Sequence, residues 1–255
     1  MQFGDDSGRV TIAVEGGVAQ VRLARPDKLN AIDKAMFGHV AQAIDWLGAQ
    51  DDLRCVVLAG EGRSFCVGLD LSVLATGLGD LAERTHGIAN LVQQVCWGWR
   101  TLPVPVIAAV HGHCFGAGMQ IALGADIRIA APDAELSIME MRHGLVPDMG
   151  LFALARGIVR EDALRELVYT ARKVPGEEAQ ALGLVTSLAD DPLDAATALA
   201  AEIAGKSPDA VRAAKRLFER MADDPPAEIL IAEAAEQQGL IDGIVAKMRG
   251  GRAEA

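Results

Sequence analysis

Two glycine-containing turns are the first candidates for chemistry in this sequence. One lies in HCFGAGMQIALGADIRIA (residues 113–130) and the other in GRSFCVGLDLS (residues 62–72). Each follows the pattern of a buried strand and precedes a helical stretch, so each offers backbone N–H groups that lack helical partners. If the two turns converge, these groups form an oxyanion hole, which binds a carbonyl oxygen as it becomes an enolate.

The first turn does not fit a phosphate-binding loop. Gly116-x-Gly118 is its nearest match to a dinucleotide fingerprint, but Ile121 stands where the third glycine is required. The sequence contains neither a GxxxxGK[ST] loop nor a GxSxG elbow, which excludes the simplest nucleotide-binding and hydrolase interpretations. The alternative to an oxyanion device is a tight strand-to-helix turn with no chemistry of its own.

The elements around these turns alternate between strand and helix, which predicts an α/β fold. Residues 10–24 predict a hairpin around a Gly-Gly turn, and the apolar, β-branched runs at 54–60, 104–112 and 126–131 predict buried parallel strands. The remaining predictions are a strand at 135–140 and helices at 31–48, 161–173 and 176–184. Strand patterns stop after residues 189–192, so we expect a core over 1–190 and a helical C-terminal region over 191–255.

Composition narrows the function further. A formal net charge of -11 disfavours nucleic acid and anionic membranes as partners. The four cysteines have no CxxC or zinc-ligand spacing, and His111, His113 and His143 fit no metal pattern, so we expect no metal and read these histidines as packing or turn residues. Free thiols, an acidic N-terminus without an apolar signal core and short apolar runs predict a cytoplasmic protein without a membrane span.

Four segments together resemble the enoyl-CoA hydratase/isomerase family, also called crotonases. They are RPDKLNAID, GRSFCVGLDLS, PVIAAVHGHCFGAGMQIALGADIRIAA and IMEMRHGLVPDMG, and the resemblance extends over roughly residues 10–250. It implies a spiral of ββα turns and a helical C-terminal part that builds homotrimers, often paired into hexamers. It also implies acyl-CoA thioester substrates, with no cofactor beyond the coenzyme A of the substrate.

The resemblance also implies roles for individual positions. The backbone N–H groups of Leu69 and Ala117 would form the oxyanion hole, although glycine is common in the family where Ala117 stands. Coenzyme A would lie near Leu29, with Arg25 or Lys28 close to its phosphates. The implied CoA-binding set is completed by Val67, Asp70 and Leu71. For the basic residues, solvated loop charges are an equally good interpretation.

The acidic positions match the family only in part. Family hydratases hold a water between two glutamates; Glu140 matches one of them, but Gln120 stands at the other, and an amide cannot exchange a proton at neutral pH. Asp148 matches a catalytic aspartate of dienoyl-CoA isomerases, which carry an aspartate where Gln120 stands. From the residues alone, Glu140 could be a solvated strand end and Asp148 a helix N-cap.

We therefore expect an enzyme that moves a double bond in an enoyl-CoA or dienoyl-CoA. Glu140 would be the principal base and Asp148 a second acid. The alternatives are a 2-enoyl-CoA hydratase, in which Gln120 positions the water, and a non-catalytic acyl-CoA-binding homologue. An apolar stripe in the C-terminal region indicates contact with a partner, and the resemblance implies that the assembly is a homotrimer or hexamer. The stripe comprises Val211, Ala214, Leu217, Phe218 and Met221.

Overall fold

The computed structural model describes residues 8–250 of the chain. These residues form two compact units, which divide between Ala204 and Gly205. The predicted boundary near residue 190 therefore falls earlier than the observed division. The reason is helix α8 (Pro192–Ala204), whose Ala196 and Ala200 are fully buried in an apolar cluster with strand residues of the first unit.

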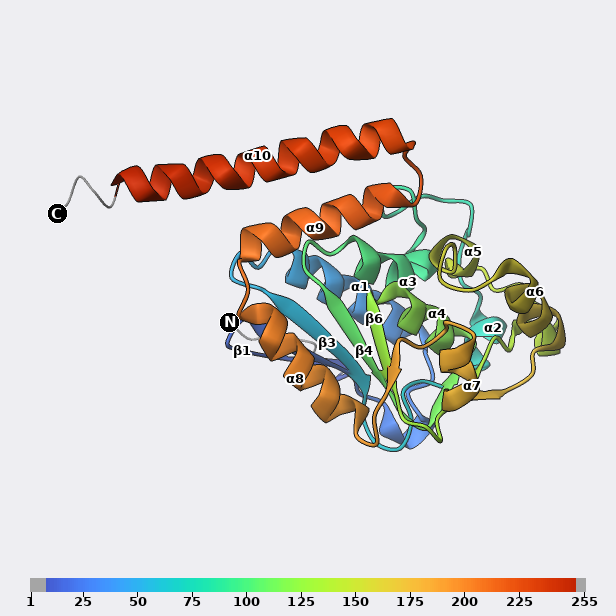
Figure 1. The fold of residues 1–255 in the computed structure, drawn as a ribbon. Helices are drawn as coiled ribbons and strands as arrows, with labels where there is room; N and C mark the ends of the chain where they lie inside the picture. The colour runs from blue at the N-terminus through green and yellow to red at the C-terminus, as the bar shows by residue number, and fades with distance from the viewer. Residues whose placement is uncertain (1–7, 251–255) are drawn as a thin grey trace. The chain divides into compact units, whose positions relative to one another are not determined.

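A six-stranded sheet forms the centre of the first unit (Figure 1). Its strand order is β1-β2-β3-β4-β6-β9, and the pairs from β2 to β9 are parallel. The bounds are β1 Val10–Glu15, β2 Val18–Leu23, β3 Cys55–Gly60, β4 Val106–Val110, β6 Ile127–Ala130 and β9 Ser187–Leu188. The predicted hairpin is confirmed as the antiparallel β1–β2 pair, and the three predicted buried strands are confirmed as β3, β4 and β6.

Alternation of side chains along β3 explains how both faces of the sheet are covered. Val56 and Leu58 join the larger core, which also contains buried residues of α1, α3 and α4. Val57 and Ala59 join the smaller cluster under α8. Successive residues of a strand point to opposite faces, so a strand that is apolar throughout must be covered on both sides.

Short helices connect the strands of this unit. Helix α1 (Lys34–Gly48) begins after Asp33, whose side chain accepts a hydrogen bond from the Met36 amide at 2.9 Å. The other helical segments are η1 Pro26–Lys28, α2 Ser72–Thr76, α3 Leu91–Thr101, α4 Ala117–Gly124, η2 Glu140–His143, α5 Leu151–Leu154, α6 Glu161–Thr170 and α7 Gly176–Ala181. The four cysteines are free and buried, as expected.

The predicted strand at 135–140 is shorter than expected. A second, three-stranded sheet contains β5 (His113–Phe115), β7 (Glu135–Ser137) and β8 (Val174–Pro175). The β5–β7 ladder ends at Phe115 and Ser137, because Gly116 has a φ of 51° and turns the chain into α4. Glu140 therefore does not end a strand; it begins the 3-10 helix η2.

The second unit consists of α9 (Pro208–Met221) and α10 (Pro226–Gly250). The two helices contact each other, and Arg216 on α9 pairs with Glu236 on α10 at 2.6 Å. Within residues 8–250, no helix is long and apolar enough to cross a bilayer. The same residues contain no group of three or more His, Cys, Asp or Glu side chains that could hold a metal ion.

Candidate active site

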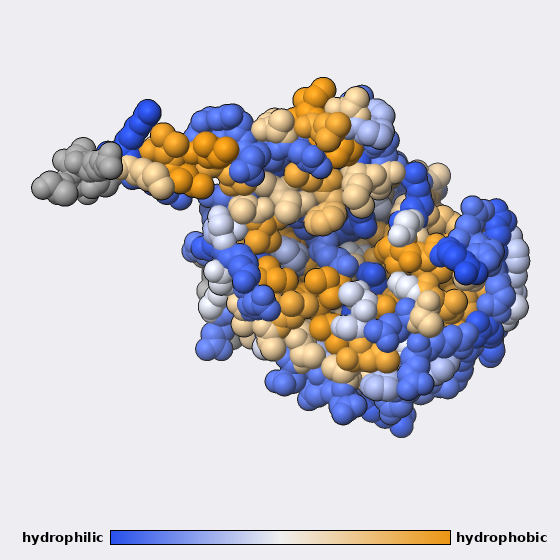
Figure 2. Space-filling view, viewed as in Figure 1, coloured by the Kyte–Doolittle hydropathy of each residue, from blue (hydrophilic) through white to orange (hydrophobic). Residues whose placement is uncertain are grey.

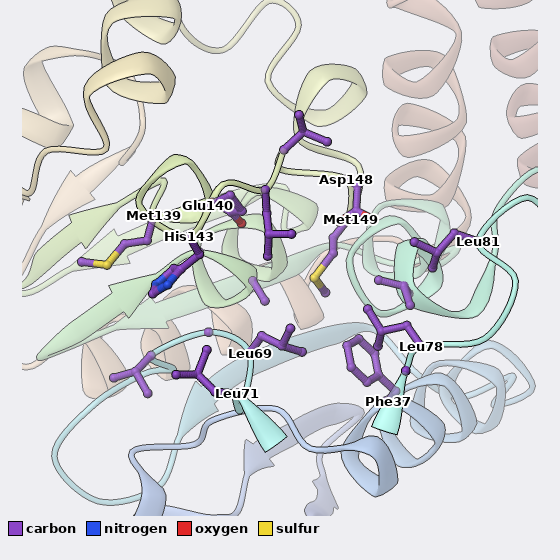
Figure 3. A pocket seen from close by; sticks show the side chains of 18 of the residues that line it. Phe37, Leu69, Leu71, Leu78, Leu81, Met139, Glu140, His143, Asp148 and Met149 are labelled. Carbon is purple, nitrogen blue, oxygen red and sulfur yellow. The ribbon is translucent and has the colours of Figure 1, made fainter. Parts of the chain in front are cut away.

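A cavity of about 490 Å³ lies within the first unit, among the 67–71 turn, the start of α4 and the segment from Met139 to Met149 (Figure 3). The polar side chains that line it are Glu140, His143 and Asp148, and the rest of the lining is apolar or glycine. Phe37, Leu78 and Leu81 mark an apolar end, whereas His143 lies toward Leu71. A mostly apolar cavity with a few converging polar groups is the usual form of a small-molecule site.

The two glycine turns meet at this cavity. Gly68 has a φ of 97°, and a Cβ atom there would lie 2.9 Å from the Phe115 carbonyl oxygen and 3.4 Å from the Ala117 nitrogen. Only glycine fits a positive φ in so little space. The Cys66 N–H also donates to the His113 carbonyl at 3.0 Å, and the Phe115 N–H donates to the Cys66 carbonyl at 2.9 Å. The expected convergence of the turns is therefore present.

In the described part of the chain, two backbone N–H groups, those of Leu69 and Ala117, remain without a hydrogen-bond acceptor where the turns meet. The Gly68 carbonyl accepts from the Ile32 N–H at 2.8 Å, and in a trans peptide the Leu69 N–H points the opposite way. Ala117 is the first residue of α4, so its N–H has no partner in the preceding turn. Neither N–H has an acceptor among residues 8–250. Both residues line the cavity, so the pair can bind one carbonyl oxygen.

Gly118 is needed for close packing between these turns. A Cβ atom at Gly118 would lie 2.3 Å from the Cys66 carbonyl oxygen and 2.8 Å from the Cys66 Cβ. Its backbone is helical, without a positive φ. The glycine pair thus turns the chain at Gly116 and lets α4 approach the 66–69 turn at Gly118.

The carboxyl group of Glu140 lies beside this pair of donors. A Cβ atom at Gly116 would be 3.5 Å from Glu140 Oε1, and Oε1 accepts a hydrogen bond from Gln120 Nε2 at 2.6 Å. Oε2 is buried without a hydrogen-bond partner in the described part of the chain. Burial raises the pKa of Glu140, and the charge of Asp148 raises it further. Hydrogen bonds to Glu140, including the one from Gln120, and the nearby His143 lower this pKa and offset part of the increase. This carboxyl is suited to accept a proton.

Gln120 itself lies behind Glu140 and does not line the cavity. Its side chain is fully buried, and its Oε1 accepts from the backbone N–H groups of Met149 at 3.0 Å and Leu151 at 3.1 Å. Because backbone N–H groups only donate, they fix the amide so that its nitrogen faces Glu140. In the hydratase alternative Gln120 was expected to position a water, but its amide contacts the Glu140 carboxyl directly and lies behind it.

Asp148 lies at the edge of the cavity with an exposed side chain. Partial burial by the cavity wall raises its pKa. The alternative role as a helix cap is not found: α5 begins at Leu151, its N-cap residue is Gly150, and it has no side-chain cap hydrogen bond. Asp148 is thus a second carboxyl group in the same cavity as Glu140.

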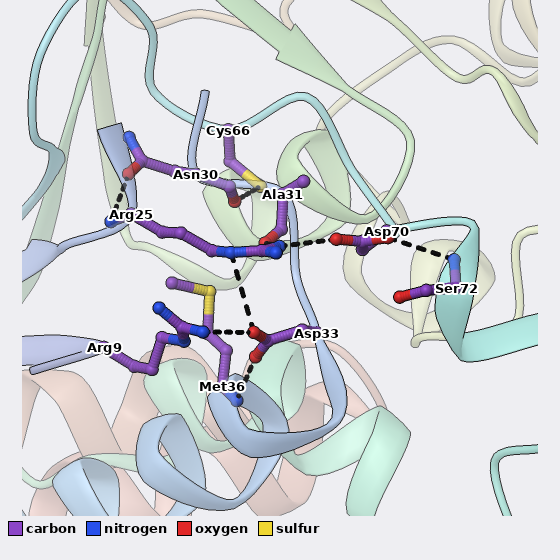
Figure 4. Close-up of polar contacts among 9 residues, drawn as sticks. All are labelled: Arg9, Arg25, Asn30, Ala31, Asp33, Met36, Cys66, Asp70 and Ser72. Carbon is purple, nitrogen blue, oxygen red and sulfur yellow. Dashed lines mark hydrogen bonds and ion pairs between the residues drawn. The ribbon is translucent and has the colours of Figure 1, made fainter. Parts of the chain in front are cut away.

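Arg25 and Asp70, both expected at coenzyme A, bind each other instead (Figure 4). Arg25 Nη1 donates to Asp70 Oδ2 at 2.6 Å and to the Ala31 carbonyl at 2.9 Å, and Arg25 Nε lies 3.6 Å from Asp33 Oδ2. The hydrogen bond from Arg25 lowers the pKa of Asp70 to about 2. Neither residue lines the cavity. With its guanidinium held by carboxylates, Arg25 is not free to bind a phosphate.

Of the other predicted CoA-binding residues, two line the cavity and two lie outside it. Val67 and Leu71 line the cavity. Leu29, which has a φ of 51°, accepts from the Val67 N–H at 3.1 Å, so it supports the turn from outside the cavity. Lys28 is exposed at the end of η1.

His143 was expected to be a packing or turn residue, but it lines the cavity. The sequence holds one usable signal for this placement, its spacing of three residues from Glu140. In a 3-10 helix, side chains three residues apart lie on the same side, whereas the predicted strand ends at Glu140 and places no element at His143. The position of His143 thus depends on the 3-10 helix, which sequence patterns did not predict.

Comparison with known proteins defines the class. Residues 13–249 match the family model described as Enoyl-CoA hydratase/isomerase, and the chain belongs to this family. The human mitochondrial Delta(3,5)-Delta(2,4)-dienoyl-CoA isomerase is 36% identical over 222 residues, which cover 82% of this chain and 67% of the isomerase. The mevalonyl-coenzyme A hydratase of Beauveria bassiana is 34% identical over 208 residues, 76% of this chain and 72% of the hydratase.

Solved structures agree with this assignment. A candidate enoyl-CoA hydratase from Thermobifida fusca YX, determined in complex with CoA, has a TM-score of 0.82 and 29% identity. The superposition covers 94% of this chain and 96% of that one. The fold is therefore that of the crotonases, as the sequence resemblance implied. The similar proteins include both an isomerase and hydratases.

Proposed function

We propose that this protein isomerises a carbon–carbon double bond in an acyl-CoA thioester. The thioester oxygen is bound by the N–H groups of Leu69 and Ala117, which stabilise the enolate formed when Glu140 removes a proton from the substrate carbon next to the carbonyl. Return of that proton to a carbon further along the chain completes the shift of the double bond. The proton leaves and re-enters the substrate, so the reaction consumes no cofactor besides the coenzyme A that the substrate carries.

The observation that favours isomerisation over hydration is the contact between Gln120 and Glu140. A water bridging two side chains needs about 2.8 Å to each, whereas Gln120 Nε2 lies 2.6 Å from Glu140 Oε1. The Gln120 oxygen is taken by two backbone N–H groups. The amide can neither hold a water against Glu140 nor exchange a proton, so Glu140 lacks the partner that two-acid hydration requires.

The two ends of the cavity suit the two parts of the substrate. The apolar end, with Phe37, Leu78 and Leu81, suits the acyl chain. Val67 and Leu71 suit the pantetheine arm, and the exposed Lys28 replaces Arg25 as the residue proposed for the phosphates. Asp148 provides a second acid for a dienoyl substrate, as the similarity to the human dienoyl-CoA isomerase suggests. Four free thiols suit a reducing compartment, and a cytoplasmic location is part of the proposal.

Hydration of a 2-enoyl-CoA is the second candidate function, favoured by the similarity to the Beauveria hydratase. In this reaction Glu140 would activate the water with an amide, and not a second carboxyl group, at position 120. The third possibility, acyl-CoA binding without turnover, is disfavoured by two retained carboxyl groups in the cavity.

An ultraviolet screen of 2-enoyl-, 3-enoyl- and 3,5-dienoyl-CoA esters tests the proposal, because both isomerisation and hydration change conjugation with the thioester. We expect isomerisation of a 3-enoyl- or 3,5-dienoyl-CoA and hydration at least about 10²-fold slower, the lower end of what a positioned acid or base contributes. Asp148→Asn is expected to lose dienoyl turnover and retain 3-enoyl turnover. Efficient hydration of 2-enoyl-CoA without isomerisation would overturn the proposal, as would CoA-ester binding without any turnover.

A further inference from the structure

The 3-10 helix η2 carries two polar side chains of the cavity lining on the same side of the helix. Glu140 is its first residue and His143 its last. With three residues per turn, side chains at these two positions lie one above the other. Both line the cavity (Figure 3). Arg142, which lies between them in sequence, does not line the cavity and donates from Nε to the Ala171 carbonyl at 3.2 Å.

The imidazole of His143 has no hydrogen bond or ion pair within residues 8–250, and Glu140 Oε2 likewise has no partner there. The other groups that face Glu140 are few. The loop before α5 contributes the carboxyl of Asp148, and α4 contributes the Gln120 amide, which does not ionise. The 68–71 turn contributes no unpaired charge, because Asp70 is bound to Arg25. The thiol of Cys96 on α3 stays neutral, because burial raises its pKa well above the ordinary value.

Glu140 therefore lies between one acidic and one basic neighbour. Burial and the negative charge of Asp148 raise its pKa, while proximity to His143 lowers it. Catalysis by a base requires the carboxylate form, which the buried site disfavours. A positive charge on the same side of η2 opposes that effect, and imidazole is the side chain that carries such a charge in the mildly acidic range.

We propose that His143 is a positioning residue for the base, holding Glu140 in its carboxylate form from one 3-10 turn away. The inference rests on the proposed function in that Glu140 is taken as the base. A positive charge at residue 143 favours the carboxylate form of Glu140. Removing the imidazolium therefore shifts protonation of Glu140 to a higher pH, and activity is lost earlier on acidification.

A charge series at residue 143 tests this inference, with kcat/KM measured from pH 5 to pH 9 on the best isomerisation substrate. His143→Gln removes the charge and keeps a hydrogen-bonding side chain, whereas His143→Lys keeps a positive charge. For His143→Gln we expect kcat/KM about fivefold below wild type at pH 5.5 and within twofold at pH 8.5. His143→Lys is expected to follow the wild-type profile at low pH, and His111→Gln, outside the cavity, serves as the control.

Two kinetic results would overturn the inference. One is a His143→Gln profile that overlies the wild type. The other is a uniform loss at every pH in both Gln and Lys variants, since that would indicate a role in shape and not in charge.

A second measurement separates this inference from the proposed function. The carboxyl band of Glu140 is isolated by subtracting the infrared spectrum of Glu140→Gln from that of the wild type. The same difference spectrum is then recorded between His143→Gln and the double variant His143→Gln/Glu140→Gln. Protonation of Glu140 is expected at a higher pH when residue 143 is glutamine. If no ester is turned over, the proposed function fails, yet this titration still decides the role of His143; an unchanged titration overturns it.

Discussion

At the scale of single residues, the glutamine at position 120 is explained by the three atoms it contacts. Its nitrogen donates to Glu140, and its oxygen accepts from the backbone of Met149 and Leu151. A carboxylate here would satisfy the two N–H groups equally well, but it would face Glu140 at 2.6 Å. Two carboxyl groups at that distance share a proton and one of them loses its charge. The amide instead leaves Glu140 as the single proton acceptor at this point.

The position of Glu140 also predicts that Glu140→Gln lowers turnover and raises the stability of the folded state. The pKa of Glu140 is raised in the folded state, so the folded chain binds more protons than the unfolded one as pH increases above the ordinary pKa of about 4.3. Stability is therefore lost as pH rises through this range and stays lost above it. A neutral glutamine has no such cost, and it can still accept the hydrogen bond from Gln120.

We expect the melting temperature of Glu140→Gln to exceed that of wild type at pH 8 by a few degrees, at about 2–4 °C per kcal/mol for a chain of this size. The difference should vanish near pH 4, where both side chains are neutral. Turnover should fall by at least about 10²-fold, while CoA-ester binding stays within a few-fold. Calorimetry across this pH range checks the prediction, and an equal difference at pH 4 and pH 8 would contradict it.

At the scale of elements, the segment from Leu29 to Ile32 fixes the backbone of residues 67–70, the turn that supplies the Leu69 N–H and is called the oxyanion turn below. Main-chain hydrogen bonds join Val67 to Leu29 at 3.1 Å, Ile32 to Gly68 at 2.8 Å and Asp70 to Ile32 at 3.0 Å. Asn30 adds to this support, since its Nδ2 donates to the carbonyls of Glu61, Ser64 and Phe65 at 2.9, 2.8 and 3.2 Å. The motif that the resemblance assigned to coenzyme A thus has a structural role in holding the Leu69 N–H.

The approach of α4 to this turn gives an element-scale prediction, tested by Gly118→Ala. The new methyl group would meet the Cys66 carbonyl at 2.3 Å, so α4 and the turn must move apart. We expect a loss of about 1–3 kcal/mol in stability and a fall in kcat of at least tenfold, because the two N–H donors no longer converge. Denaturant unfolding and steady-state kinetics measure the two effects.

Gly38→Ala is the matched control for this substitution. Gly38 lies within α1, and a Cβ atom there would meet no atom within 4 Å. Alanine favours helix over glycine by about 1 kcal/mol, so this variant should be neutral or more stable, with unchanged kcat. If Gly118→Ala behaves like Gly38→Ala, close packing at the oxyanion turn is not what residue 118 provides.

At the scale of the whole molecule, the second unit carries an apolar surface that a single chain leaves exposed. Apolar side chains gather along α10 in the space-filling view (Figure 2). The exposed apolar residues of α9 and α10 are Phe218, Met221, Leu230, Ile231, Ile241, Ile244, Val245 and Met248. Surfaces of this kind usually mark contacts with other chains.

We expect the active protein to be a homotrimer or a multiple of it, in keeping with the sequence resemblance. Light scattering at micromolar concentration measures the mass directly. Ile244→Asp, which places a charge on the exposed apolar face of α10, is expected to lower the mass, and Gln238→Asp on the same helix is the surface control. A monomeric wild type with full activity would contradict the prediction.

The sequence by itself determined the hairpin, the buried parallel strands, the family and the positions of Leu69, Ala117, Glu140 and Asp148 at one cavity. The hairpin and the strands follow from local periodicity, whereas the family and the four site positions follow from the resemblance of the quoted segments to the enoyl-CoA hydratase/isomerase family. Only the tertiary structure decided that Gln120 lies behind Glu140, that Arg25 is bound to Asp70 and that His143 lines the same cavity as Glu140. The first two depend on atoms from segments far apart in sequence, such as residues 120, 140 and 149, and no local pattern specifies which hydrogen bonds such segments make when they meet. The third depends on a 3-10 helix that sequence patterns did not predict.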